Sequence, residues 1–321
     1  MFSSSAGSLM KTRPFIVKIL AIEPQEYKPA SIKSIFFNFP MKSTLLKNLI
    51  FSVSTLGLVQ SQAKSQEAPP ICPTNPNSLA AVGGFCVLTP EQYGVKIYEM
   101  GLCTSNPLAN NNFSKASCFT SLSNSSPATT DMASGGTFNL TSQNPVEGRP
   151  DSGAYTHAYI IISPEFELKF TYKLNNINYY SNGDDSSASN PVNNVSTTGP
   201  SQSFVETLND FGDDEEGFSA SAQAIVSGGS IAALLTDSNL NTSTASTETQ
   251  RLVGVFTPDN PIQISEGTSG LEVKFIVTNQ GGGLEACEGA LDQVCNYGSG
   301  PFSAKFTPVS YTHLRAHETE S

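Results

Sequence analysis

Apolar residues occupy every second position in several short segments of this chain, and turn-forming residues separate the segments. In 166–172, for example, aromatic and aliphatic residues alternate with Glu167, Lys169 and Thr171. A β-strand with one buried and one solvated face shows this two-residue period. Because no segment has a clear amphipathic period of 3.6 residues, the pattern predicts an all-β protein.

The same criterion places the individual strands. They are expected at 93–103, 137–141, 155–162, 166–174, 203–208, 219–226, 230–235, 252–256, 262–265, 271–278 and 302–307. Ser163-Pro164 separates two of them, which we expect to form a hairpin. Gly228-Gly229 interrupts a segment that its alanines could otherwise make helical, so we expect two strands there. The glycines at 281–283 are expected to form a turn, and the Asn- and Ser-rich stretch at 175–203 is expected to be a long loop or a linker between two domains. Many short strands favour a β-sandwich, jelly-roll-like or immunoglobulin-like, and the pattern does not select the topology.

All six cysteines follow an N-terminal apolar segment, and no two form a C-x-x-C pair. They are Cys72, Cys86, Cys103, Cys118, Cys287 and Cys295. In an exported chain, an even number of such cysteines favours disulfide bonds over zinc binding or redox chemistry. Pairing of sequence neighbours predicts Cys287 with Cys295, Cys103 with Cys118, and Cys72 with Cys86, each bond contributing about 2–4 kcal/mol. The alternative, in which some or all remain structural thiols, stays open.

A signal peptide is expected at 41–63. Two lysines precede the apolar run 49–59, and small residues follow it. A basic start, an apolar run of about 7–15 residues and a small-residue exit are typical of secretory signals, and this run is too short to span a bilayer. Cleavage between Ala63 and Lys64 would give a secreted, periplasmic or cell-surface protein with no membrane span in its mature region.

Both ends are expected to lie outside the folded domain. Residues 1–40 precede the signal peptide, and a mis-called start codon is the simplest explanation; a targeting extension or a nucleic-acid-binding arm is the alternative. Residues 309–321 resemble the translation of a sequencing adapter and are expected not to be native, which leaves any anchor or sorting signal undefined. Between them we expect an extended cysteine-containing lead-in at 64–90 and a β-sandwich domain at 91–308. A division into two domains near 176–203 stays open.

The charge of the expected mature region narrows the choice of partners. Residues 64–308 contain 9 Lys and Arg against 24 Asp and Glu, which gives −15, whereas the whole chain carries −11. A strongly acidic protein repels the phosphate backbone of nucleic acids. Nucleic acid is therefore not an expected partner of this region.

The densest group of carboxylates is a candidate calcium site. Five of them lie within seven residues: Asp210, Asp213, Asp214, Glu215 and Glu216. Ca²⁺ binds about six to eight oxygen ligands, and carboxylates supply them well. The spacing matches no EF-hand loop, so a solvated acidic loop is the alternative.

A second candidate site combines aromatic and polar side chains in a stretch rich in Asn and Ser. It contains Asn178, Tyr179, Tyr180 and Asp184. Aromatic faces stack on sugar rings while amides and carboxylates bond the hydroxyls, so this stretch is a candidate ligand-binding loop. A surface loop without a ligand is the alternative.

No catalytic residues are predicted, because no serine lies in a G-x-S-x-G motif and His157 is the only histidine outside the expected adapter tail. The first hypothesis is an exported non-enzymatic surface or periplasmic protein with a structural, adhesive or ligand-binding role. Its partner would be a cell-surface glycan or protein. The alternative is a secreted polysaccharide-active hydrolase or lyase that uses carboxylates such as Glu165, Asp213 or Asp214. A virion surface protein is a weaker third hypothesis, because the signal peptide argues against it.

Overall fold

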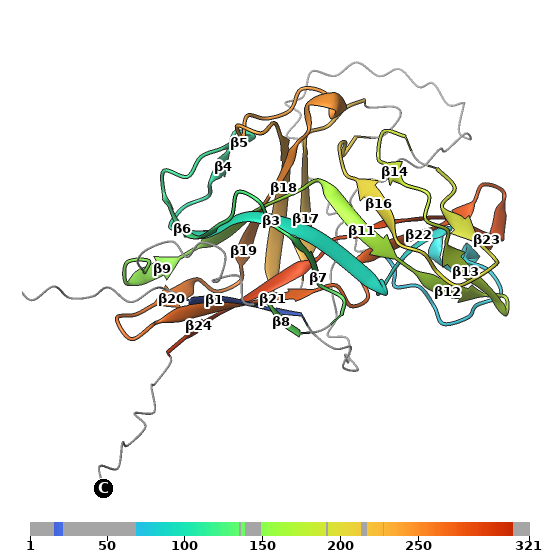
Figure 1. Ribbon diagram of the computed structural model, residues 1–321, viewed down its shortest axis with the longest axis horizontal. Coiled ribbons are helices and arrows are strands. Elements are labelled where there is room, and N and C mark those ends of the chain that lie inside the picture. Colours follow the sequence, from blue (N-terminus) through green and yellow to red (C-terminus); the bar gives the residue numbers. More distant parts are fainter. Residues whose placement is uncertain are drawn as a thin grey trace, which may run out of the picture.

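The structure is a computed structural model. It describes residues 16–21, 69–134, 136–138, 149–190, 192–212, 217–226 and 228–310, and of 16–21 and 136–138 it describes the backbone alone. These residues form strands and connections without an α-helix (Figure 1). The predicted all-β fold is therefore confirmed. The expected signal peptide at 41–63 and residues 311–321 of the expected adapter tail lie outside the described residues. Ile16–Ala21, within the upstream extension that the sequence places outside the domain, pairs with it as strand β1.

The larger layer is a ten-stranded sheet. Eight of its strands follow one another in the order β14 (Ser186–Ser187), β16 (Phe204–Thr207), β11 (Glu165–Lys169), β3 (Gln92–Cys103), β10 (His157–Ile162), β19 (Arg251–Pro258), β18 (Gly229–Thr236) and β17 (Ser221–Val226). The remaining two, β6 (Cys118–Ser123) and β7 (Thr129–Asp131), also pair with β3. The long strand β3 thus pairs with four other strands along its length. The two strands expected on either side of Gly228-Gly229 are β17 and β18, and they form a hairpin.

The hairpin expected at Ser163-Pro164 is wrong. Both β10 and β11 run antiparallel to β3, the first along its C-terminal half and the second along its N-terminal half. The chain therefore continues in one direction past Ser163, whose amide donates to the carbonyl of Lys96 (2.9 Å). Pro164 interrupts the ladder because it has no N–H, but it does not reverse the chain.

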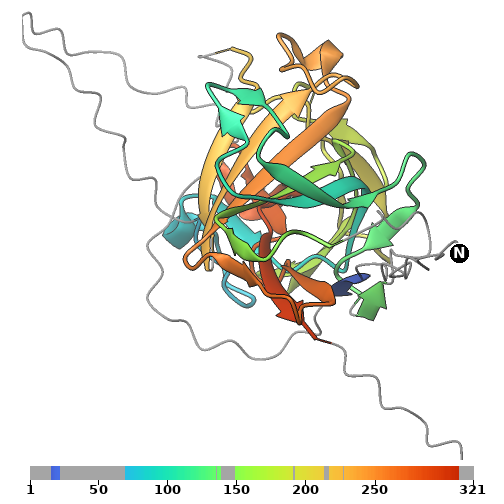
Figure 2. The same cartoon turned by 90° about the vertical axis from the view of Figure 1, so that its left-hand side faces the viewer.

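Three smaller sheets make up most of the remaining structure. The first contains, in order, β24 (Ser303–Val309), β21 (Gly270–Ile276), β1 (Ile16–Ala21) and β8 (Gly136–Phe138). The second contains β2 (Phe85–Leu88), β22 (Gly282–Cys287) and β23 (Ala290–Ser299). The third contains β12 (Thr171–Leu174), β13 (Ile177–Ser181) and β15 (Val195–Ser196). Two further pairs are β9 (Gly153–Tyr155) with β20 (Ile262–Ile264), and β4 (Leu108–Ala109) with β5 (Asn112–Phe113). In Figure 1 the sheet of β21 and β24 lies below the large sheet, and Figure 2 shows the strands around a common interior.

The main hydrophobic core lies between the large sheet and the smaller sheets. Ile160 and Leu168 enter it from the large sheet, and Val273 and Tyr297 enter it from two of the smaller ones. The rings of Phe170 and Tyr297 stack with centroids 4.8 Å apart. A second, smaller cluster covers the outer face of the large sheet around β10 and β19. The arrangement is the layered packing of a β-sandwich.

All six cysteines are paired, which confirms a disulfide-stabilised fold. The pairs are Cys72 with Cys86, Cys103 with Cys118, and Cys287 with Cys295. They are the local pairings that the sequence favours. The first joins the lead-in to β2, the second joins β3 to β6, and the third joins β22 to β23.

Two segments expected to be loops contain strands. The glycines at 281–283 are expected to form a turn, but β22 begins at Gly282. The glycine at 282 is explained by packing, because a Cβ there would lie 2.1 Å from the Cε1 atom of Phe170. The expected loop at 175–203 contains β13 and β15. A tight turn at Asn175 and Asn176, both with positive φ (51° and 62°), leads into β13, and Asn is one of the residues that tolerate this conformation.

Candidate functional site

An apolar pocket lies between the large sheet and the segment that follows β23. Its lining is mostly aliphatic and aromatic, and its residues are Tyr93, Ile160, Ile162, Phe166, Ala188, Leu208, Asp210, Phe211, Ile231, Ala233, Leu252, Gly254, Ser299, Gly300, Pro301 and Phe302. The volume of the pocket, measured as the space open to the centre of a water-sized sphere, is about 50 Å³. Concave, mostly apolar sites with a few polar groups are where proteins bind small molecules.

Two small residues lie at paired positions in the lining of the pocket. Gly254 of β19 pairs with Ile160 of β10 on one side and with Ala233 of β18 on the other. Directly paired residues point to the same face of a sheet, so Gly254 and Ala233 lie side by side on the face that lines the pocket. A Cβ at Gly254 would lie 3.1 Å from Cγ2 of Ile160 and 3.7 Å from Cδ1 of Ile231, so these two side chains already pack close to the glycine. The lining therefore depends on which residues meet across three strands.

The polar groups of the pocket are already engaged within the protein. The Tyr93 hydroxyl donates to the carbonyl of Gly300 (3.1 Å). The Asp210 Oδ1 atom accepts from the amides of Gly212 (2.7 Å) and Ser219 (2.9 Å), which closes the loop after β16. Tyr93 and Asp210 are the ionisable side chains of the described lining. The pocket therefore suits an apolar guest better than acid–base chemistry on a polar one.

A buried carboxyl group lies next to the pocket. Glu206 of β16 is only 6% exposed, because it lies two positions from the core residue Phe204 and points to the same face of the strand. Its Oε2 atom accepts the amide of Ser299, a pocket residue (2.5 Å). Burial raises the pKa of Glu206, and the bond from Ser299 opposes this only in part. The same carboxyl group and burial raise the pKa of Tyr93 well above its ordinary value, with burial the larger cause.

The candidate calcium site is represented by one described residue. Asp210 lies at the pocket, and its Oδ1 atom is occupied by two backbone amides. The other four members, Asp213 to Glu216, lie outside the described residues. In the part of the chain that the structure describes, no three His, Cys, Asp or Glu side chains gather as metal ligands would. The Ca²⁺ site stays a prediction.

The candidate ligand-binding loop is partly a strand with alternating sides. Tyr179 points inward and is 5% exposed, and Tyr297 donates its hydroxyl to the carbonyl of Tyr179 (2.9 Å). The alternation of β13 therefore buries the ring that the sequence predicts to stack on a sugar. Tyr180 is half-buried and accepts a bond from Asn178 Nδ2 (3.0 Å). Asp184 binds the side chain of Asn182 (2.9 Å). A role for the other three in ligand binding stays a prediction.

Of the carboxylates considered for the polysaccharide enzyme, Asp213 and Asp214 lie outside the described residues, and Glu165 lies on β11 near a second carboxylate, Glu167. Glu165 forms an ion pair with Lys96 (3.0 Å). Glu167 accepts from the hydroxyl of Thr129 (2.8 Å). His157 lies on β10, where burial lowers its pKa, and its Nδ1 atom is 2.8 Å from the hydroxyl of Thr156. None of these three lines the apolar pocket.

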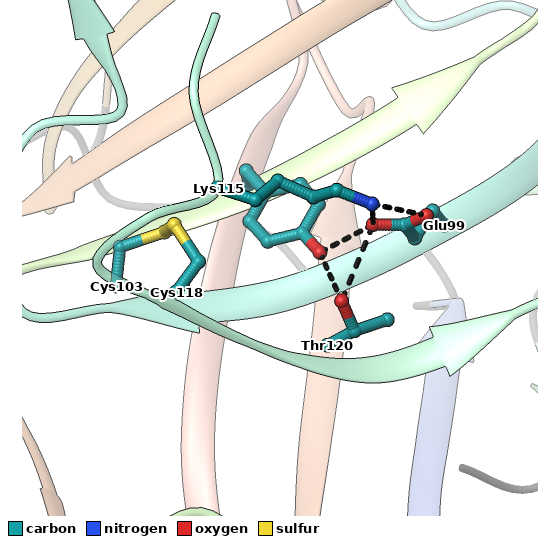
Figure 3. Close-up of polar contacts among 6 residues, drawn as sticks. Glu99, Cys103, Lys115, Cys118 and Thr120 are labelled. Atoms are coloured by element: carbon teal, nitrogen blue, oxygen red, sulfur yellow. Dashed lines mark hydrogen bonds and ion pairs between the residues drawn. A yellow bond between two sulfur atoms is a disulfide. The ribbon is translucent and has the colours of Figure 1, made fainter.

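A polar network on the outer face of the large sheet is not evident from the sequence. Glu99 of β3 accepts bonds from the hydroxyl of Tyr159 (2.6 Å) and from Lys115 (2.8 Å). Thr120 contacts both Glu99 and Tyr159 (3.3 and 2.8 Å). Figure 3 shows Glu99, Lys115 and Thr120 beside the disulfide that joins β3 and β6. Because all its members are satisfied, the network fastens β3, β6 and β10 to one another.

The pocket is not evident from the sequence, because its residues come from distant segments. The one local signal is that Gly254 lies between Val253 and Val255 in a bulky strand, whereas Ala233 is one of several small residues in β18. A small residue at an inward position weakens packing and marks a bulge or a close approach. The signal does not show which small residues become neighbours.

Comparisons of the chain with models of protein families, with curated protein sequences and with solved structures gave no significant match.

Proposed function

We propose that this protein is an exported, non-enzymatic binding protein, and that its pocket between the sheets holds a small apolar molecule or the apolar end of a larger one. The observation that carries the proposal is the apolar lining of the pocket, in which Ile160, Gly254 and Ala233 lie in one row across three strands. The proposed location is a cell surface, the periplasm or the surrounding medium.

The size and lining of the pocket support an apolar guest. A water needs about 10–15 Å³ of such volume, so the pocket has room for several atoms. Water in it would find few partners, because the polar groups of Tyr93 and Asp210 are hydrogen-bonded already. An empty apolar space weakens packing by an amount that grows with its volume. A guest that fills it would recover this loss.

The disulfides support export. Three bonds join all six cysteines of the described residues, and such bonds are typical of oxidising compartments. Among the described residues, no helix is long and apolar enough to cross a membrane. The predicted signal peptide at 41–63 would provide the route.

The pocket can be tested with a series of straight-chain alcohols from butanol to decanol. A ligand that binds only the folded state raises the unfolding midpoint. We expect the midpoint to rise with chain length and then to level off when the pocket is full. The measurement is thermal unfolding by circular dichroism at fixed alcohol activity.

Two variants of β18 separate the pocket from general solvent effects. Ala233→Leu fills the pocket, whereas Ala232→Leu adds the same volume on the other side of the strand. We expect the first to weaken alcohol binding by at least about tenfold and the second to leave it unchanged. Equal responses of the two variants, or no response of the unmodified protein, would rule out the pocket as the site.

Export is tested separately by sequencing the N-terminus of the protein recovered outside the cytoplasm. We expect it to begin at or near Lys64. Retention of the intact chain inside the cell would contradict export without touching the pocket.

A further inference from the structure

Strand β1 occupies a central position in its sheet, although it comes from the extreme N-terminal part of the chain. It runs parallel to β21, from Ile16 opposite Gly270 to Ala21 opposite Phe275. On its other side it pairs antiparallel with β8, where Ile19 lies opposite Phe138. Figure 1 shows the dark-blue β1 among the strands of this sheet. The rest of the protein therefore supplies both neighbours of this strand.

The position of β1 is a slot between two strands. Neighbouring strands lie about 4.8 Å apart, so a strand between β8 and β21 spans about 10 Å. β21 is also paired with β24, whereas the described pairing of β8 is with β1, so the edge of β21 is the fixed side of the slot. Without β1, this edge would present unpaired amide and carbonyl groups, which are a template for another strand. The slot borders the core, because Leu271, Val273 and Phe275 of β21 are at most 2% exposed. An empty slot would leave the backbone beside these core residues unpaired.

Nothing covalent joins β1 to the folded body except the chain that contains the expected cleavage point. The three disulfides lie between Cys72 and Cys295 and do not involve β1. A cut between Ala63 and Lys64 would leave Ile16–Ala21 without a covalent link to the folded body, and the described contacts that hold it are its backbone pairings with β21 and β8.

We propose that the slot between β8 and β21 is a strand-binding site, and that Ile16–Ala21 is its separable occupant. The ligand class is an extended apolar peptide that docks parallel to β21 through main-chain hydrogen bonds. The segment IVKILA contains β-branched residues that favour the extended conformation. The inference meets the proposed export at one point: an exported body that begins near Lys64 lacks β1, so its slot is open to another extended peptide. An engineered cut tests the slot independently of export.

The experiment starts from the folded full-length chain with a protease site inserted within 41–63. After cleavage, size-exclusion chromatography and mass spectrometry show whether the N-terminal fragment remains with the body. A fluorescent peptide of residues 13–24, RPFIVKILAIEP, is then added, and its binding is followed by anisotropy. We expect the fragment to stay bound and to exchange slowly for the peptide.

Two peptides with changes at one position provide the control. Ile19 pairs with both neighbours, Val273 of β21 and Phe138 of β8. Ile19→Pro removes the N–H and distorts the ladder, so we expect binding at least about 100-fold weaker. Ile19→Val keeps the backbone donor and a β-branched side chain, and we expect it to bind like the unmodified peptide.

Three outcomes would overturn the proposal. One is a body that releases the fragment, stays folded and binds no peptide. Another is equal binding of the Ile19→Pro and Ile19→Val peptides, which would mean that strand pairing is not involved. The last is a cleaved body that dimerises and excludes the peptide, because a second copy would then fill the slot. None of these results depends on alcohol binding or on export, so the failure of either proposal can be told from the failure of this one.

Discussion

Glu206 places a carboxyl group inside the core, next to the pocket. Burial raises its pKa, and hydrogen bonds from the side chain and the amide of Ser299 oppose this in part. A buried charge is unfavourable unless it is well paired. The group is therefore most compatible with the folded state when it is protonated.

The sign of the pH effect follows from this shift. Because the folded protein binds the proton more tightly than the unfolded chain does, stability falls as the pH rises from the ordinary glutamate value of about 4.5 through the raised pKa. We expect Glu206→Gln to remove this part of the fall, so that the variant gains stability over the unmodified protein as the pH rises. Urea unfolding at several pH values measures the difference in stability between the two proteins, with Glu266→Gln on the surface as the control. Parallel pH profiles for the unmodified protein and Glu206→Gln would contradict the assignment.

The side chain of Asn194 pairs with the backbone of β23 as a neighbouring strand would. It is fully buried, its Nδ2 donates to the carbonyl of Tyr297 (2.8 Å), and its Oδ1 accepts from the amide of the same residue (2.8 Å). Two bonds to one residue join the segment before β15 to β23.

Removal of the Asn194 amide should be costly. Asn194→Ala leaves a buried donor and a buried acceptor of Tyr297 without partners, and each such group costs about 1–3 kcal/mol. We expect the free energy of unfolding to fall by about 2–5 kcal/mol, measured by urea denaturation. Asn193→Ala, at the exposed neighbouring position, should cost less than about 1 kcal/mol. Equal losses at 193 and 194 would show that the two hydrogen bonds between Asn194 and Tyr297 do not account for the loss of stability.

At the scale of elements, local alternation predicted the strands better than their partners. Every predicted range overlaps a strand of the structure, because a two-residue period depends only on neighbours in sequence. The hairpin at Ser163-Pro164 was wrong because β10 and β11 both pair with β3, and local patterns do not encode that alignment. The turn predicted at 281–283 failed for the same reason, because Gly282 makes room for the ring of Phe170, a residue distant in the sequence.

The close contact of Gly282 in β22 with Phe170, which lies between β11 and β12, leads to a test with a neighbouring control. In Gly282→Ala the new methyl group would lie 2.1 Å from Cε1 of Phe170, too close without movement of the core. In Gly283→Ala it would lie 3.3 Å from Cε2 of Phe85, a contact that a small shift relieves. We expect a loss of about 3 kcal/mol or more for the first and less than about 1 kcal/mol for the second. Thermal unfolding of both variants decides it, and a reversed order would contradict the packing.

At the scale of the molecule, the three disulfides close loops of 14, 15 and 8 residues, one in the lead-in, one on the large sheet and one on a smaller sheet. Each is expected to add about 2–4 kcal/mol by restricting the unfolded chain. Their sum is comparable to the whole stability of a typical domain, about 5–15 kcal/mol.

Reduction of all three bonds should therefore bring the protein close to its unfolding limit. We expect the urea midpoint of the reduced and alkylated protein to fall steeply, or the cooperative transition to disappear at 37 °C. The comparison is with oxidised protein treated with the alkylating agent alone. An unchanged midpoint after titration of all six thiols would show that the β-sandwich core alone stabilises the fold.

By itself, the sequence determined the all-β class, the approximate strands and the local disulfide pairs, because periodicity and short loop closure depend on residues that are near one another in the chain. Tertiary structure alone decided that Tyr179 is buried, that β10 and β11 share β3, and that Ile160, Gly254 and Ala233 meet in one row. The register between distant strands sets these contacts. A residue's neighbours across a sheet depend on every turn and bulge between the strands, so the pocket emerges only when the chain is folded.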